Sequence, residues 1–186
     1  MLGPARKAID RFDVVVESFV ARVRGRPVVD RTFYAASELG DFGLIWLLLA
    51  SARSLRGGRH EKAAIRVAIA APAESVLVNG VIKSFFRRTR PPWDVVRPHR
   101  LRRPLSSSFP SGHASAAAMH AILLSEDDPC WPLYVAVAAV VASSRVYVKI
   151  HHPSDVLAGA ALGVALGLLG RRVMPLPPSG GGRAKD

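Results

Sequence analysis

Three short segments of this chain combine histidines with cations, a combination suited to phosphate chemistry. They are 83–91 (KSFFRRTRP), 109–115 (FPSGHAS) and 144–155 (SRVYVKIHHPSD). Lys83, Arg90 and Arg145 could together gather the oxygens of a phosphate group. Ser111 and Gly112 precede an apolar stretch, and the start of a helix offers free N–H groups to an anion. The sequence therefore predicts one anion site built from all three segments.

Two histidines could supply the reactive groups of that site. His151 and Asp155 are four residues apart, so they share a helix face if a helix begins early enough. Asp155 could accept a proton from one imidazole nitrogen and leave the other free as a nucleophile. His113 could donate a proton to a departing alkoxide. This is a complete set for phosphoryl transfer in which fixed cations replace Mg²⁺, so we expect no metal and no other cofactor.

The remaining histidines have weaker claims. Spacing from Arg145 and to Asp155 selects His151 over the adjacent His152. We interpret three others, which lack partners at useful spacing, as structural: His60, His99 and His120. Further arginines could contact anionic headgroups or form a solvated loop beside the membrane: Arg87, Arg88, Arg97, Arg100, Arg102 and Arg103.

Long apolar blocks must position these segments. The chain is 49% hydrophobic, and its apolar residues gather at 34–54, 63–82, 131–148 and 156–169, with a shorter block at 114–124. The first three approach the roughly 20 residues that a membrane span requires. Residues 8–24 form an amphipathic pattern too polar to span, which could lie in the interface or pack on the bundle. We predict an all-α membrane bundle of about five transmembrane helices in residues 31–173, after an amphipathic segment 1–30 and before a disordered tail 174–186.

Two features inside the apolar blocks have structural interpretations. Gly159, Gly163 and Gly167 recur every four residues, which indicates close helix packing, either within the chain or in a dimer. Glu74 lies inside a span, where it could pair with a basic group of the site or sit near water at a helix face.

Alternating spans would bring all three segments to one membrane face and the turns 53–62 and 126–129 to the other. The net charge is +12, which suggests an anionic partner. The face with the site holds 17 Lys and Arg against 9 on the other, or 14 without Lys83, Arg90 and Arg145. This bias favours a cytoplasmic site. The apolar blocks, which have no place in a soluble basic domain, disfavour nucleic acid as the partner.

The three segments resemble the signature of the type 2 phosphatidic acid phosphatase family, which shares its phosphate site with vanadium haloperoxidases. The family pattern is Lys, six residues, Arg-Pro; then Pro-Ser-Gly-His; then Ser-Arg, five residues, His, three residues, Asp. This sequence meets the pattern in order, with Lys83 and Arg90-Pro91, then 110–113, then Ser144-Arg145 with His151 and Asp155. The match covers about the C-terminal two-thirds of the chain, and the joint pattern is highly specific.

The resemblance implies roles for each matching residue. His151 attacks phosphorus and forms a phosphohistidine, His113 protonates the leaving group and then activates water, and Asp155 orients His151. The phosphate is bound by the remaining matching residues: Lys83, Arg90, Ser111, Gly112 and Arg145. Many members have six spans, so the amphipathic segment in place of a first span is a departure that affects the helix count.

The resemblance further implies an integral-membrane lipid phosphatase, a metal-independent phosphoric monoester hydrolase of a bacterial plasma membrane, whose partners are a lipid phosphate and the bilayer. The compact form is similar to actinobacterial members that act on decaprenylphosphoryl-5-phosphoribose, a cell-wall precursor. A polyprenyl diphosphate, phosphatidic acid or phosphatidylglycerophosphate phosphatase remains an alternative. Apolar blocks and short length disfavour a haloperoxidase-like oxidoreductase, and the complete reactive set disfavours a silent scaffold. The sequence names neither the lipid nor the oligomeric state.

Overall fold

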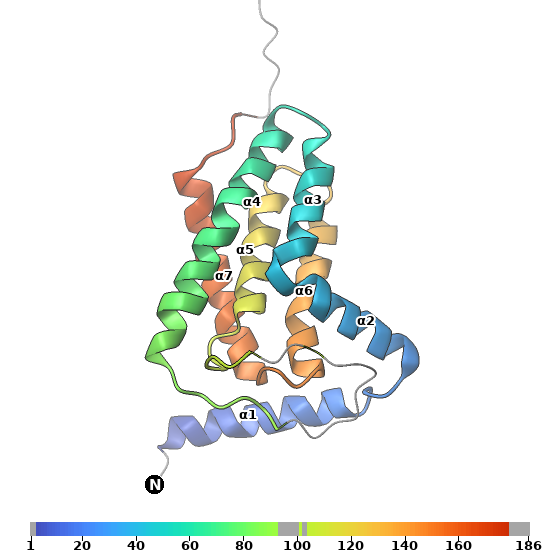
Figure 1. Ribbon diagram of the computed structural model, residues 1–186, viewed down its shortest axis with the longest axis vertical. Coiled ribbons are helices and arrows are strands. Elements are labelled where there is room, and N and C mark those ends of the chain that lie inside the picture. Colours follow the sequence, from blue (N-terminus) through green and yellow to red (C-terminus); the bar gives the residue numbers. More distant parts are fainter. Residues whose placement is uncertain (1–2, 93–100, 102–103, 179–186) are drawn as a thin grey trace, which may run out of the picture.

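The chain forms a bundle of helices along one long axis, with a further helix lying across one end (Figure 1). The computed structural model describes residues 3–92, 101 and 104–178. Within these ranges the elements are α1 (Pro4–Ala21), α2 (Pro27–Leu39), η1 (Asp41–Gly43), α3 (Leu44–Ser54), α4 (Arg59–Ser75), η2 (Val76–Val81), η3 (Ile82–Phe85), α5 (Gly112–Ser125), α6 (Trp131–Tyr147) and α7 (Pro153–Val173). The described residues contain no strand, and the predicted all-α class is confirmed.

The chain alternates between the two ends of the bundle, as the apolar blocks predict. The connections from η3 to α5 and from α6 to α7 lie at the end crossed by α1 (Figure 1). The turns from α3 to α4 and from α5 to α6 lie at the opposite end. All three segments with candidate chemistry are therefore brought to the same end.

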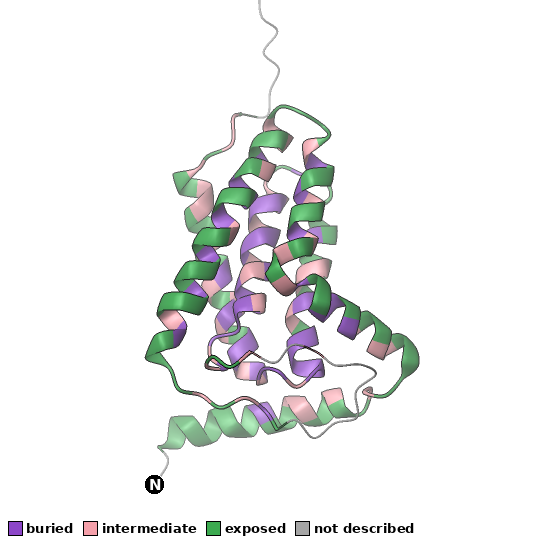
Figure 2. Cartoon of the chain, viewed as in Figure 1, coloured by how far each residue is buried: buried purple, intermediate pink, exposed green. Residues whose placement is uncertain are grey.

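The outer faces of the bundle are apolar, as expected for helices that contact lipid. Two continuous helices of the described ranges, Arg59–Phe85 and Pro153–Val173, are long and apolar enough to cross a membrane. The bent pair α2–α3 could form a third span, and α6 is a shorter apolar helix. Helix α5 has only 14 residues but lies in the centre of the bundle, where protein covers it (Figure 2). To reach the predicted number of about five spans, the bent pair α2–α3 must count as one span and the short helices α5 and α6 must be included.

The predicted first span, 34–54, is not one straight helix. Its two halves, α2 and α3, are bent by 71° at the intervening break. Phe42 and Gly43 there have φ of 55° and 70°, values outside the right-handed helical region. The bend lies inside the predicted block, just before its most apolar part. It turns Asp41 toward the bundle, where the Asp41 carboxylate contacts His113 of α5.

Helices α5 and α7 make the closest packing of the bundle, because the glycine stripe faces α5. A Cβ atom on Gly159 would lie 2.3 Å from the Ser111 carbonyl oxygen, and one on Gly163 would lie 2.1 Å from the Ser115 carbonyl oxygen. The stripe therefore serves a contact within the chain, where two backbones approach directly.

We expect Gly163→Ala to destabilise the protein by about 1–3 kcal/mol, because the methyl group would push two backbones apart. Thermal unfolding in detergent would measure the loss. Gly80→Ala is the control, since a Cβ atom there meets nothing within 4 Å. A Gly163→Ala protein that melts with the wild type would contradict this account of the packing.

Candidate active site

The predicted site residues meet at the end of the bundle that α1 crosses. Lys83 lies at the end of the long helix, His113 in the first turn of α5, and Arg145 in the last turn of α6. His151 lies in the short connection after α6, and Asp155 lies in the first turn of α7. Because α7 begins at Pro153, Asp155 is brought close to His151 as the sequence required.

The His151 imidazole is held by a backbone carbonyl. Its Nδ1 lies 2.7 Å from the Ser108 carbonyl oxygen, which can only accept, so Nδ1 carries the hydrogen and Nε2 keeps its lone pair. Asp155 Oδ2 is 3.7 Å from the same Nδ1. The expected direct hydrogen bond from His151 to Asp155 is thus replaced by one to the carbonyl. On the other side of the ring, Arg90 Nη1 lies 3.3 Å from Nε2 and also donates to the Ile150 carbonyl at 2.9 Å.

The surroundings keep this imidazole neutral. Burial lowers the pKa of His151 to about 3; Asp155 opposes this shift, and the charges of Arg145, Arg90 and Lys83 reinforce it. All three predicted phosphate-binding cations therefore lie near enough to act on His151. A neutral imidazole with its lone pair on Nε2 is the form that can attack an electrophile.

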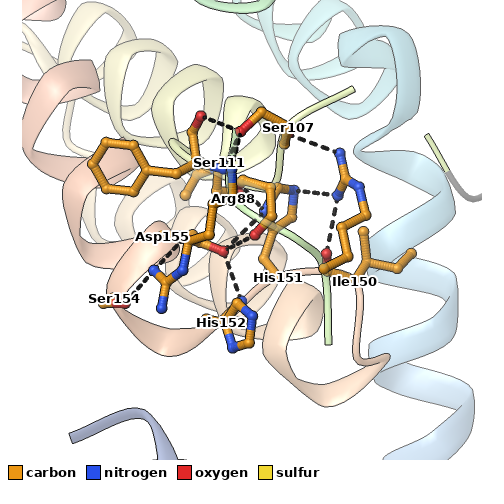
Figure 3. A network of polar contacts seen from close by, with 12 residues as sticks. Arg88, Ser107, Ser111, Ile150, His151, His152, Ser154 and Asp155 are labelled. Atoms are coloured by element: carbon orange, nitrogen blue, oxygen red, sulfur yellow. Dashed lines mark hydrogen bonds and ion pairs between the residues drawn. The ribbon is translucent and has the colours of Figure 1, made fainter. Parts of the chain in front are cut away.

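Asp155 connects several parts of the site (Figure 3). Its carboxylate is fully buried, accepts from Arg88 at 2.6 Å and from the His152 N–H at 2.9 Å, and is bonded by the Ser108 hydroxyl. Its backbone carbonyl accepts the Ser111 N–H at 3.0 Å. Asp155 thereby contacts the hydroxyl of Ser108, the residue whose carbonyl holds the His151 imidazole.

Two of the cations are buried in the bundle. Lys83 is 7% exposed and donates to the Asn79 side-chain oxygen at 2.8 Å. Arg145 is 2% exposed and donates to both the carbonyl and the hydroxyl of Ser37 on α2. Within the described residues its Nε makes no hydrogen bond, so Arg145 retains a donor for an anion.

The start of α5 supplies backbone donors. The Ser111 N–H is occupied by the Asp155 carbonyl, so the N–H groups available from the first turn are those of Gly112 and His113. A Cβ atom on Gly112 would lie 2.5 Å from the Asn79 side-chain oxygen. Glycine at this position therefore lets α5 approach the helix that carries Lys83.

His113 has a partner that the sequence analysis missed. Its Nε2 lies 2.8 Å from Asp41 Oδ1 in the bend between α2 and α3. This contact fixes the orientation of the His113 ring from the bend between α2 and α3. The available signal was an acidic residue inside the predicted apolar block 34–54.

Arg88 and Asp13, which the sequence analysis did not pair, connect α1 to Asp155. Arg88 donates to Asp13 on α1 as well as to Asp155, each at 2.6 Å. Asp13 is 6% exposed and also accepts from the backbone and hydroxyl of Ser154, each at 2.8 Å. The N-terminal helix thus packs on the bundle through a polar contact, while apolar residues such as Phe12 and Phe19 remain exposed. Nothing in the sequence distinguishes Asp13 from the other acids of α1.

Comparison with known proteins identifies the family. Residues 63–177 match the PAP2 superfamily. The chain belongs to that superfamily. Decaprenylphosphoryl-5-phosphoribose phosphatase of Mycobacterium tuberculosis is 31% identical over 86% of this chain and 85% of the relative. Undecaprenyl-diphosphatase of Sulfolobus acidocaldarius is 33% identical over 55% of this chain and 52% of the relative. The crystal structure of Aquifex aeolicus LpxE matches with a TM-score of 0.68 at 25% identity, over 86% of this chain and 94% of that one.

These findings confirm the predicted resemblance, the integral-membrane helical fold and the class of lipid phosphatase, a phosphoric monoester hydrolase. The individual roles of the site residues stay predictions. The arginines expected at 97–103 and the tail residues 179–186 lie outside the described residues. Within the described ranges, no three His, Cys, Asp or Glu side chains gather as metal ligands would.

We expect Asp13→Asn to lower kcat for phosphate release from a lipid phosphate about tenfold with little change in KM, because Arg88 loses a charge-assisted bond and holds Asp155 less firmly. Asp10→Asn is the matched control, since Asp10 is an exposed acid on the same helix. Equal kcat for the two variants would show that α1 does not support the site.

Proposed function

We propose that this protein removes the terminal phosphate of a polyprenyl-phosphate sugar phosphate such as decaprenylphosphoryl-5-phosphoribose, in the synthesis of a cell-wall precursor. The observation that carries the proposal is the pair of histidines at one cationic site, in a chain that aligns over most of its length with a phosphatase of that name. The reaction is the hydrolysis of a phosphate monoester at the membrane surface.

The geometry supports a two-step mechanism. Nε2 of His151 attacks phosphorus, the bond from phosphorus to the alcohol oxygen breaks, and His113 gives the leaving oxygen a proton. Water activated by His113 then cleaves the phosphohistidine and releases inorganic phosphate. Lys83, Arg90 and Arg145 neutralise the charge that develops on the phosphate oxygens, aided by Ser111 and by the first-turn N–H of Gly112.

Two observations support the choice of lipid and of membrane face. The chain aligns with about half of the undecaprenyl-diphosphatase but with most of the phosphoribosyl-lipid phosphatase. We therefore prefer a phosphoribosyl lipid as the substrate. Polyprenyl diphosphate remains the alternative. The excess of Lys and Arg on the site-bearing face, 17 against 9, supports a site on the cytoplasmic face of a bacterial plasma membrane.

We expect His151→Ala to abolish phosphate release from lipid phosphates, because alanine lacks the Nε2 that is proposed to attack phosphorus. Vanadate should inhibit the wild type, since its trigonal-bipyramidal form mimics the transition state. His152→Ala is the control for the neighbouring imidazole, and an unchanged melting temperature would show that both variants fold. Turnover at the wild-type rate by His151→Ala would refute the nucleophile.

We expect EDTA to leave the rate of phosphate release unchanged, because fixed cations take the place of a metal at the phosphate. The rate should be followed before and after dialysis against the chelator, with Mg²⁺ added back as the comparison. Loss of activity that Mg²⁺ restores would contradict the metal-independent mechanism.

A screen of substrates tests the proposed lipid. Purified protein should release phosphate faster from a phosphoribosyl polyprenyl phosphate than from phosphatidate, phosphatidylglycerophosphate or a polyprenyl diphosphate. Release from the others with none from the phosphoribosyl lipid would leave the phosphatase class standing and remove this substrate.

A further inference from the structure

The bend between α2 and α3 contacts two residues of the candidate site. Nε2 of His113 lies 2.8 Å from Oδ1 of Asp41, the first residue of η1. The Arg145 guanidinium donates to the carbonyl and the hydroxyl of Ser37, in the last turn of α2. One short stretch of chain therefore reaches both the candidate proton donor and a candidate phosphate-binding cation.

The backbone at this bend carries Asp41 to the His113 ring. Phe42 and Gly43 have φ of 55° and 70°, in the left-handed region, where the chain leaves the direction of α2. Gly40 packs on the imidazole, since a Cβ atom there would lie 3.0 Å from Cδ2 of His113. A side chain at position 40 would crowd the ring, whereas glycine lets the carboxylate of the next residue reach Nε2.

Asp41 selects the nitrogen of His113 that can exchange a proton with the substrate. An ionised carboxylate can only accept a hydrogen bond, so Nε2 carries the hydrogen of this contact. The neutral ring then has its lone pair on Nδ1, and the protonated ring has on Nδ1 the proton that it can give away. Without the carboxylate, either nitrogen of the neutral ring could hold the hydrogen. The contact therefore fixes the tautomer of His113 as well as its orientation.

We propose that Asp41 is a positioning residue for the reaction and acts through His113. This inference rests on the proposed function. In the first step, the bond from phosphorus to His151 forms, the bond to the alcohol oxygen breaks, and Nδ1 of His113 gives that oxygen a proton. In the second step, Nδ1 takes a proton from water, the water oxygen bonds to phosphorus, and the phosphohistidine bond breaks. The hydrogen on Nε2 stays directed at Asp41 throughout.

The kinetic test uses the lipid phosphate that the wild type cleaves fastest. Asp41→Asn should lower kcat about 10- to 100-fold and change KM less than about threefold, because an amide can donate to Nε2 and favour the wrong tautomer. Asp41→Glu, which keeps a carboxylate, should recover part of the lost rate. Asp10→Asn is the matched control, since it makes the same change at an exposed position of α1 and should keep the wild-type kcat.

A spectroscopic test reads the tautomer without relying on activity. The chain has 6 histidines, and nitrogen NMR of protein labelled with [15N]histidine can report the ring nitrogens of each. The signals of His113 are those that His113→Ala removes. In the wild type they should show a hydrogen on Nε2. In Asp41→Asn they should move toward the tautomer with the hydrogen on Nδ1, whereas in Asp10→Asn they should not move.

The possible results separate this inference from the proposed function. A neutral His113 with its hydrogen on Nδ1 in the wild type would overturn the inference even if Asp41→Asn fails to fold. Equal kcat for Asp41→Asn and the wild type, or a loss of rate with unmoved His113 signals, would also overturn it and leave the phosphatase standing. A wild type that releases phosphate from no lipid phosphate would remove the proposed function, and this inference with it.

Discussion

The buried carboxylate of Asp155 is the contact on which the rest of the site depends. A fully buried charge is costly unless it is paired and hydrogen-bonded, and here Arg88, the Ser108 hydroxyl and the His152 N–H satisfy it. The same residue accepts the Ser111 N–H through its backbone. One residue thus ties the start of α7 to the start of α5 and to the segment that holds His151.

The acids around the site come from elements far apart in the sequence. Asp13 lies on α1, Asp41 in the bend before α3, and Asp155 on α7. They pair with Arg88 and with His113, whereas two of the cations proposed to bind phosphate, Lys83 and Arg145, are buried near the partly exposed Arg90. The like charges of these three cations repel one another, and a phosphate bound as proposed would relieve that repulsion.

Helix packing and site geometry are consequences of the same contacts. Gly159 lies one turn after Asp155 and directly beneath the Ser111 carbonyl, and Gly163 repeats the contact one turn deeper. Because two backbones touch, α5 cannot shift toward α7, and the first-turn N–H groups of α5 stay at a fixed distance from His151. The packing that stabilises the bundle therefore also positions the proposed anion site.

The sequence alone determined the helical class, the membrane location, the residues of the three segments and their arrival at one end of the bundle. These follow from apolar block lengths and from spacing, which are local properties of the chain. Only the tertiary structure decided that the Ser108 carbonyl holds His151, that Asp41 partners His113, and that Asp13 reaches Asp155 through Arg88. Each of those contacts joins residues far apart in the sequence. No local pattern records which distant polar group will complete a buried hydrogen bond.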